Sequence, residues 1–402
     1  MLSKKNLKIF LLVTLAFIIC GVIIYFIFFN SIKYTTHSAI SSLEDVPQSS
    51  KPSDITIPPI SQPPTPVPVT HIQTPNYVKA VYLSSWVAGS PKYRDPIIKL
   101  IDDTELNSIV IDIKDSTGRI GYITDNQDLN RIGSVQGRIP NIRSLINTLH
   151  QKNIYVIGRI AVFQDPYMTK IKPEWSIVKN SDGKVWKDNK GLSFLDPANQ
   201  DVWKYIVSIA LDAHSEGFDE INFDYIRYPS DGNIQDINYH LTPGKTRSDN
   251  LESFFKYLSL ELKKDNITMS ADLFGLTTTT NDDMGIGQLW EKTLPYFDFV
   301  SPMVYPSHYP SGQYGFKNPA DHPYEVISKA LQSAIKKTKA MQDQDIHKIR
   351  PWLQDFDLGA VYTKDKVRLE MQAVYDSGLN SWMLWDPKNK YTPSALKLDI
   401  NQ

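Results

Sequence analysis

Between residue 77 and the end of the chain, short runs rich in β-branched and aromatic residues alternate with segments of helical spacing. The runs are Tyr77–Trp86, Ser108–Asp115, Ile154–Phe163, Glu220–Tyr228, Thr268–Gly275, Asp298–Tyr305, Arg350–Phe356 and Ser381–Asp386. The helical segments are Pro96–Leu106, Ile142–Gln151, Gln200–Ser215, Leu251–Lys264, Met284–Leu294, Pro323–Met341 and Lys364–Asp376. Such alternation predicts parallel strands that are joined by right-handed crossovers and covered by helices.

Eight strand–helix units over residues 77–402 fit a (β/α)8 TIM barrel, an α/β fold. An open, doubly wound sheet is the alternative. Its nucleotide-binding members carry a glycine-rich turn after the first strand, and neither GxGxxG nor GxxxxGK[ST] occurs in this chain. The sequence therefore favours the barrel.

The N-terminal segment predicts a membrane anchor. Lys4, Lys5 and Lys8 precede residues 9–29, an uncharged apolar run that would measure about 31 Å as a helix and could cross a bilayer. The positive-inside rule then puts residues 1–8 in the cytoplasm and everything after the span outside it. We expect a single-pass protein of the cell membrane, with the lipid bilayer as one partner.

Residues 30–76 read as a linker. Nine prolines fall in this segment, and residues 55–78 contain no Asp, Glu or Arg and no Lys. A stretch of this composition buries too little apolar surface to offset its chain entropy, and its prolines favour extended polyproline II. We expect a disordered stalk that carries the barrel away from the membrane.

Charge and cysteine content exclude several classes of protein. The chain has 43 Lys and Arg against 44 Asp and Glu, so it offers no basic surface for nucleic acid. One cysteine, Cys20, excludes an internal disulfide and a cysteine zinc cluster. The chain also lacks HExxH, GxSxG and histidines three or four apart, so we expect no metal or other cofactor.

Two aspartates are the candidate catalytic pair. The alternation of side chains along strands at 220–228 and 268–275 turns Asp224 and Asp272 into the barrel, near the ends where barrel enzymes place their chemistry. On neighbouring strands their carboxyl groups would lie roughly 5–9 Å apart, which covers both geometries of glycoside hydrolysis. The competing interpretation is that these aspartates cap strand ends or pair with Arg159, Lys114 and Arg227.

Other side chains at the strand ends are candidates for binding a sugar. Alternation places Asp112 and Lys114 inside the barrel as well. Aromatic faces stack on the C–H faces of sugars, and of the many aromatic residues near strand ends we select three as platforms. The predicted substrate-binding residues are Asp112, Lys114, Arg159, Arg227, Tyr305, Gln354, Trp385 and Trp86.

Five segments resemble one known family. They are residues 78–82, 111–115, 218–232, 301–306 and 350–356, and the most specific is FDYIRYPSDG within 223–232. Together they resemble the "putative glycosyl hydrolase domain" family of bacterial envelope proteins across about 77–390. The resemblance implies a TIM barrel related to amylase-type and other glycoside hydrolases, with Asp224 as the acidic residue at the end of strand four.

A more distant similarity limits the mechanism. The arrangement Asp219-x-x-Asn222-x-Asp224-x-Ile226 is similar to the catalytic strand of family-18 chitinases, which have glutamate where this chain has Ile226. Amylase-type barrels have glutamate on strand five, where this chain offers Asp272, and aspartate on strand seven, where alternation turns Asp355 away from the centre.

We therefore expect an extracytoplasmic, membrane-anchored glycoside hydrolase that cleaves a polysaccharide by two-carboxylate catalysis. Asp224 would be the nucleophile or base, and Asp272 the proton donor. The alternative from another class is a non-catalytic carbohydrate-binding or envelope-attachment protein on the same barrel, since a fold does not imply an activity.

Overall fold

The computed structural model describes residues 68–241, 243–342 and 344–398. The predicted span at residues 9–29 and most of the predicted linker lie outside these ranges. The described residues all belong to one compact unit, Thr65–Gln402. No helix in the described ranges is both long enough and apolar enough to cross a membrane.

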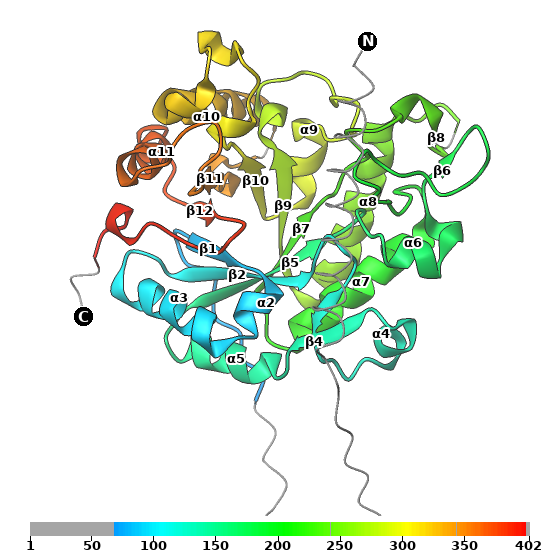
Figure 1. Cartoon of the computed structure of the whole chain (residues 1–402), viewed down its shortest axis with the longest axis horizontal. Coiled ribbons are helices and arrows are strands. Elements are labelled where there is room, and N and C mark those ends of the chain that lie inside the picture. Colours follow the sequence, from blue (N-terminus) through cyan, green and yellow to red (C-terminus); the bar gives the residue numbers. More distant parts are fainter. Residues whose placement is uncertain (1–67, 242, 343, 399–402) are drawn as a thin grey trace, which may run out of the picture. The chain divides into compact units, whose positions relative to one another are not determined.

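Eight parallel strands close into a barrel, which confirms the predicted TIM-barrel fold (Figure 1). The barrel strands are β1 (Lys79–Leu83), β2 (Ser108–Lys114), β5 (Tyr155–Ala161), β7 (Glu220–Asp224), β9 (Thr268–Phe274), β10 (Phe299–Met303), β11 (Trp352–Gln354) and β12 (Trp382–Trp385). They follow one another around the barrel in that order, and β12 pairs with β1 to close it. Each falls within one of the eight runs predicted from the sequence.

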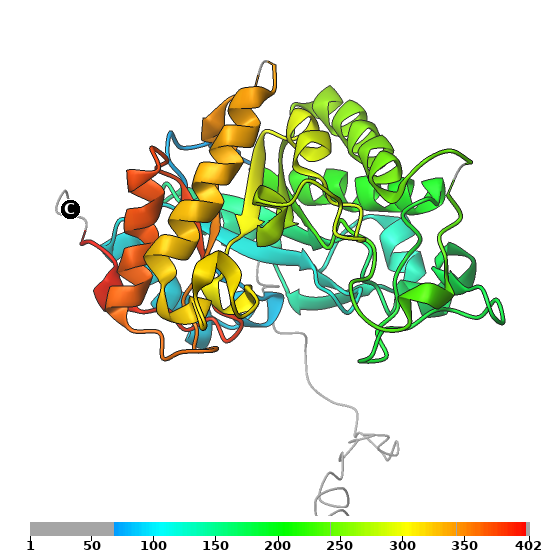
Figure 2. The same ribbon diagram turned by 90° about the horizontal axis from the view of Figure 1, so that it is seen from above.

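Helices surround the strands. They are α2 (Ser85–Ala88), α3 (Pro91–Asp103), α4 (Gln127–Ile132), α5 (Ile142–His150), α6 (Met168–Ile171), α7 (Gln200–Ser215), α8 (Arg247–Leu262), α9 (Trp290–Thr293), α10 (Pro323–Ala340) and α11 (Lys364–Asp376). Figure 2 shows α10 and α11, in orange and red, on the opposite side of the strands from the green helices α7 and α8. Their apolar faces and the outward faces of the strands form one continuous core.

The helix expected over 284–294 is a single turn, α9. Met284, Gly285 and Gly287 all have positive φ angles, which an α-helix does not allow. Apolar spacing alone could not show this, because the backbone conformation of the segment depends on its contacts with distant parts of the chain.

Three crossovers contain additional strands. β3 (Ile120–Tyr122) and β4 (Val135–Ile139) extend the sheet from β2, with β3 antiparallel to it. β6 (Val178–Lys179) and β8 (Ile237–Asn238) form a separate antiparallel pair. The crossovers after β2, β5 and β7 are therefore partly built from strands.

The last residues of the predicted linker are docked on the barrel. The amide of Ile72 donates a 2.8 Å hydrogen bond to Oδ1 of Asp219, and Thr74 Oγ1 lies 2.9 Å from the hydroxyl of Tyr155. The Ile72 side chain packs against apolar side chains inside the barrel. These contacts are at the amino-terminal ends of β5 and β7, so residues 70–76 cover the end of the barrel opposite to the one where barrel enzymes place their chemistry.

Candidate active site

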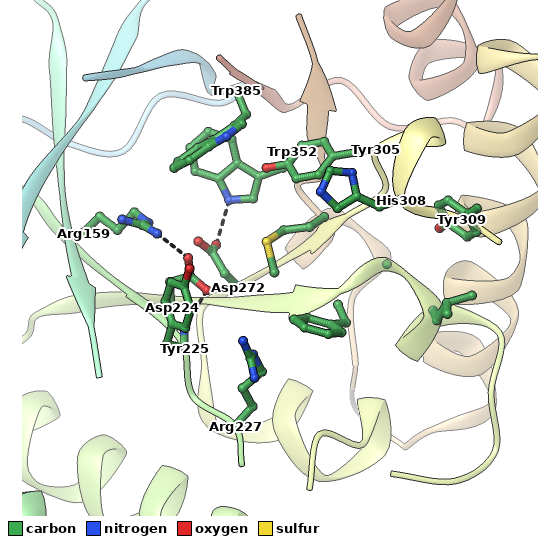
Figure 3. Close-up of a pocket in the computed structure, with 14 residues that line it drawn as sticks. Arg159, Asp224, Tyr225, Arg227, Asp272, Tyr305, His308, Tyr309, Trp352 and Trp385 are labelled. Atoms are coloured by element: carbon green, nitrogen blue, oxygen red, sulfur yellow. Dashed lines mark hydrogen bonds and ion pairs between the residues drawn. The ribbon is translucent and has the colours of Figure 1, made fainter. Parts of the chain in front are cut away.

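A cavity of about 350 Å³ opens at the carboxyl ends of the barrel strands, within the size range of pockets that bind small ligands. Six of its lining residues are aromatic, and four carry a charge or an acidic group. The lining residues are Arg159, Asp224, Tyr225, Arg227, Asp272, Phe274, Gly275, Leu276, Met303, Tyr305, His308, Tyr309, Trp352 and Trp385 (Figure 3).

Asp224 is the last residue of β7 and points into this cavity (Figure 3). Its Oδ2 accepts a 2.5 Å hydrogen bond from Nη2 of Arg159, and its Oδ1 accepts one of 2.6 Å from the amide of Tyr225. Tyr225 has a φ of 51°, a left-handed conformation that is uncommon for a residue other than glycine. This turn ends the strand and fixes the orientation of the Asp224 carboxylate.

Asp272 lies on β9, the strand next to β7, and is almost fully buried. Its Oδ1 accepts two hydrogen bonds, one of 2.9 Å from the side-chain amide (Nδ2) of Asn222 and one of 2.8 Å from the indole N–H of Trp352. Burial, and then the nearby negative charge of Asp224, raise the pKa of Asp272 to about 8. At neutral pH Asp272 is therefore a carboxylic acid with a proton to donate.

Arg159, on β5, connects two carboxylates. Its Nη1 donates to Oδ1 of Asp112 at 2.6 Å, while Nη2 donates to Asp224. The other oxygen of Asp112 accepts a 2.6 Å hydrogen bond from the hydroxyl of Tyr82. These hydrogen-bonded side chains are buried. They therefore hold the Arg159 guanidinium in one position, and through it the Asp224 carboxylate.

Aromatic side chains form the wall opposite Arg227. Trp385 stacks on Tyr82 with ring centroids 4.0 Å apart and meets Trp352 edge-on at 5.6 Å. Tyr305 packs edge-on against His308 and Phe356. Figure 3 shows Trp385, Trp352 and Tyr305 on one side of the two aspartates. An aromatic wall beside a pair of carboxyl groups is a surface on which a sugar ring can stack.

The structure brings six of the ten predicted site residues to the cavity. They are Asp224, Asp272, Arg159, Arg227, Tyr305 and Trp385. The register places Asn222 opposite Ser270 and Phe223 opposite Ala271, so Asp224 and Asp272 follow at equivalent positions of neighbouring strands, as expected.

Two predicted binding residues on β2 do not reach the cavity. Asp112 lies behind Arg159 and positions it. Lys114 is fully buried, forming a 2.9 Å ion pair with Asp165 and donating to the carbonyl of Ala161. The pairing of β2 with β5 shifts register after Asp112, so that Lys114 lies opposite the outward-facing Ile160. This irregularity breaks the alternation that predicted an inward side chain.

The other two misplaced residues are Gln354 and Trp86. Gln354 is buried, accepts from the amide of Ser307 and donates to the carbonyl of Phe356, so its amide stabilises two loops. Trp86 lies on α2, is 66% exposed and stacks with Arg138 at 4.6 Å, outside the cavity. The chain turns into α2 at Ser85 and carries Trp86 away from the barrel axis.

Sequence reasoning missed the two donors to Asp272. Trp352 was one aromatic residue among many near strand ends, and its contact with Asp272 spans 80 residues. Strand alternation gives Asn222 the same inward direction as Asp224, but it does not say what an inward side-chain amide contacts. Among the described residues, no group of three or more histidine, cysteine or acidic side chains could hold a metal ion.

Solved structures share this fold. The glycoside hydrolase domain of PgaB (BpsB) from Bordetella bronchiseptica aligns with a TM-score of 0.59 and 13% identity, over 80% of this chain and 99% of that domain. The C-terminal domain of a "putative chitinase" from Desulfitobacterium hafniense aligns with a TM-score of 0.50 and 11% identity, over 79% of this chain and 96% of that one. At these identities the similarity shows a common barrel.

A hypothetical protein from Ruminiclostridium thermocellum is 36% identical, over 48% of this chain and 96% of its own length, with a TM-score of 0.44. No curated protein matches the chain. The family model described as "Putative glycosyl hydrolase domain" matches residues 80–391, which include every residue of the cavity and all of the barrel strands except Lys79, the first residue of β1. The chain therefore belongs to this glycosyl hydrolase domain family.

Proposed function

We propose that the barrel hydrolyses the O-glycosidic bonds of a polysaccharide, with Asp272 as the general acid and Asp224 as the nucleophile or base. The observation that carries the proposal is the unequal pair in one cavity. Asp272 keeps its proton at neutral pH because of burial and the nearby charge of Asp224, whereas Asp224 is ion-paired with Arg159. Hydrolysis of a glycoside requires this division between an acid and a carboxylate.

The contacts of Asp272 indicate where its proton lies. Both N–H donors, from Asn222 and Trp352, are directed to Oδ1. The proton therefore belongs on Oδ2, from which it would pass to the glycosidic oxygen as the bond to the anomeric carbon breaks. After this step Asp272 is a carboxylate, and the same two donors stabilise its charge.

Asp224 would complete the reaction in one of two ways. It either attacks the anomeric carbon to form a covalent glycosyl intermediate, which water then hydrolyses as the Asp272 carboxylate takes up the proton of that water, or it removes a proton from a water molecule that attacks the anomeric carbon directly. In both cases the hydrogen bonds from Arg159 and from the Tyr225 amide orient the carboxylate before substrate arrives. Trp385 and Tyr305 would hold the sugar ring against the pair.

The test is the release of reducing ends by the full chain from a panel of bacterial-envelope and plant polysaccharides. We expect release from at least one polymer, and a loss of about 10²–10⁴-fold for Asp224→Asn. Asp355→Asn is the matched control, because Asp355 is a buried aspartate at a strand end that contacts Thr392 and does not line the cavity. Retention of the chain on a polymer without any release would contradict the proposal and support a carbohydrate-binding protein.

We also propose that the barrel acts outside the cell membrane, anchored through residues 9–29. The support is the uncharged run at 9–29 and the lysines that precede it. Protease treatment of intact cells tests this point: the barrel should be degraded without lysis, and complete protection in intact cells would contradict the placement.

A further inference from the structure

Arg227 is a buried cation in the cavity, and no acidic side chain of the described residues forms an ion pair with it. It is only 8% exposed and lines the cavity, yet it forms no ion pair with any residue in the described part of the chain. Buried arginines are normally paired with carboxylates, because the loss of hydration is costly. Arg159, in the same cavity, follows this rule with two carboxylate partners.

Protein contacts use only part of the Arg227 guanidinium. Nη1 donates to the carbonyl of Tyr228 at 3.0 Å and to Oγ of Ser230 at 3.3 Å. Within the described residues, no acceptor is hydrogen-bonded to Nε or Nη2. A guanidinium presents five N–H donors in a fixed plane. The donors on Nε and Nη2 are therefore left for another molecule.

Aromatic rings flank the Arg227 cation. Its Cζ lies 4.8 Å from the ring centre of Phe274 and 5.2 Å from that of Tyr225. Cation–π contacts stabilise a charge without neutralising it. The carboxylates of Asp224, Asp231 and Asp188 also favour the charged form of Arg227, although none of them forms an ion pair with it. The two rings also fix its direction, and Figure 3 shows the guanidinium rising into the cavity below Asp224 and Asp272.

Asp224 does not serve as the missing partner. One of its oxygens accepts from Arg159 and the other from the amide of Tyr225. The strained turn at Tyr225 separates the side chains of Asp224 and Arg227, because it ends the strand directly after Asp224. Ile226 is then buried in the core, and Arg227 returns to the cavity. The local backbone thus presents a carboxylate and an unpaired cation to the same ligand.

We propose that the substrate carries an anionic group, a carboxylate or a phosphate, and that Arg227 recognises it. This inference rests on the proposed function, because it names the class of polysaccharide that the same cavity cleaves. A carboxylate or phosphate accepts a pair of parallel N–H bonds from guanidinium and supplies the ion-paired charge that the described residues do not. A neutral sugar hydroxyl would leave the Arg227 guanidinium without an ion-pair partner.

The test measures binding rather than turnover, so it gives a result even if no polymer is hydrolysed. Calorimetric titration of the full chain uses five probes: D-glucuronate, D-galacturonate, D-glucose 6-phosphate, D-glucose and D-glucuronamide. Glucuronamide is the neutral isostere of glucuronate. The two uronates and the phosphate distinguish the two kinds of anion.

We expect at least one acidic probe to bind about tenfold or more tightly than glucose, and glucuronate to exceed glucuronamide if the group is a carboxylate. Arg227→Gln should remove this preference. Arg119→Gln should keep it, because Arg119 stacks on Tyr167 outside the cavity. The preference should also persist in Asp224→Asn, which separates this inference from hydrolysis.

Equal affinities for acidic and neutral probes in the wild-type chain would overturn the proposal, as would the absence of binding by all three acids. A preference that survives in a folded Arg227→Gln chain would also overturn it. The comparison of the acidic probes with glucose and glucuronamide needs no variant, so the proposal stays testable if Arg227→Gln fails to fold.

Discussion

The indole Nε1 of Trp352 donates a 2.8 Å hydrogen bond to Oδ1 of Asp272 inside the barrel. Trp352 begins β11 and Asp272 lies on β9, so the contact passes over the intervening strand β10. The bond favours the ionised form of Asp272 and opposes the upward effect of burial on its pKa. Trp352 is therefore a positioning residue that adjusts how easily the acid gives up its proton.

Replacement of Trp352 by phenylalanine should raise the pKa of Asp272 further. The substitution removes the N–H donor and keeps an aromatic ring in the barrel. A hydrogen bond to a charged group contributes about 1.5–3 kcal/mol, so the alkaline limb of the pH profile of kcat should move upward by about one unit or more. Trp382→Phe is the matched control, since the fully buried Trp382 donates to Tyr375 away from the cavity. If the alkaline limb of kcat lies at the same pH in Trp352→Phe and Trp382→Phe, Trp352 does not adjust the pKa of Asp272.

The pH dependence of hydrolysis should show that Asp272 acts as an acid. Because the pKa of Asp272 is raised to about 8, its protonated form prevails below that pH and is lost above it. We expect turnover to fall about tenfold for each pH unit above 8. In the Asp355→Asn variant this limb should be unchanged, although burial also raises the pKa of Asp355, to about 6. A rate that rises through pH 8 would contradict the assignment.

Arg159→Met should destabilise the fold strongly at neutral pH. It removes the only cation that the described residues place between the buried carboxylates of Asp112 and Asp224. Breaking a buried pair in this way costs about 3–5 kcal/mol in the free energy of unfolding. Arg131→Met, which removes a surface pair with Asp128, should cost less than about 1 kcal/mol. Urea denaturation of both variants measures the difference, and equal losses would show that Arg159 has no special structural role.

Asp219→Asn should loosen residues 70–76 from the base of the barrel. The two oxygens of Asp219 accept from the amides of Ile72 and Val156, and Nε2 of His150 lies 2.9 Å away. Asparagine offers one acceptor oxygen, so a buried donor is left unpaired at a cost of about 1–3 kcal/mol. Hydrogen exchange should become faster at the amide of Ile72, whereas Asp201→Asn, on the exposed face of α7, should leave it unchanged. Unaltered exchange in Asp219→Asn would argue against this attachment.

The architecture and the acidic pair could be predicted from the sequence because both follow from periodicity. Eight alternating units specify a closed parallel barrel, and a period of two turns Asp224 and Asp272 to the same interior. The same period failed for Lys114, where the register shift with β5 changes the direction of the side chain. A local pattern does not contain such an irregularity, since it arises between residues of β2 and β5 that are 47 positions apart in the chain, such as Asp112 and Arg159.

The remaining site residues depend on contacts between distant segments. The sequence predicts that Gln354 binds substrate, because strand alternation cannot identify its partners, Ser307 and Phe356. Trp352 is the opposite case. Its residue type and position are typical of the barrel core, but its indole donates a hydrogen bond to Asp272. Residue type and strand position predict which side chains enter the barrel, whereas hydrogen-bond partners across it require the fold.

The roles of the two aspartates can be separated with aryl glycosides of the sugar that the polysaccharide panel identifies. A dinitrophenolate leaves without protonation, whereas a sugar alkoxide needs the proton of Asp272. Asp272→Asn should therefore lose natural-substrate turnover but retain most of its activity on the dinitrophenyl glycoside, and Asp224→Asn should lose both. Equal losses of Asp272→Asn on the two substrates, or full activity of Asp224→Asn on either, would contradict the account.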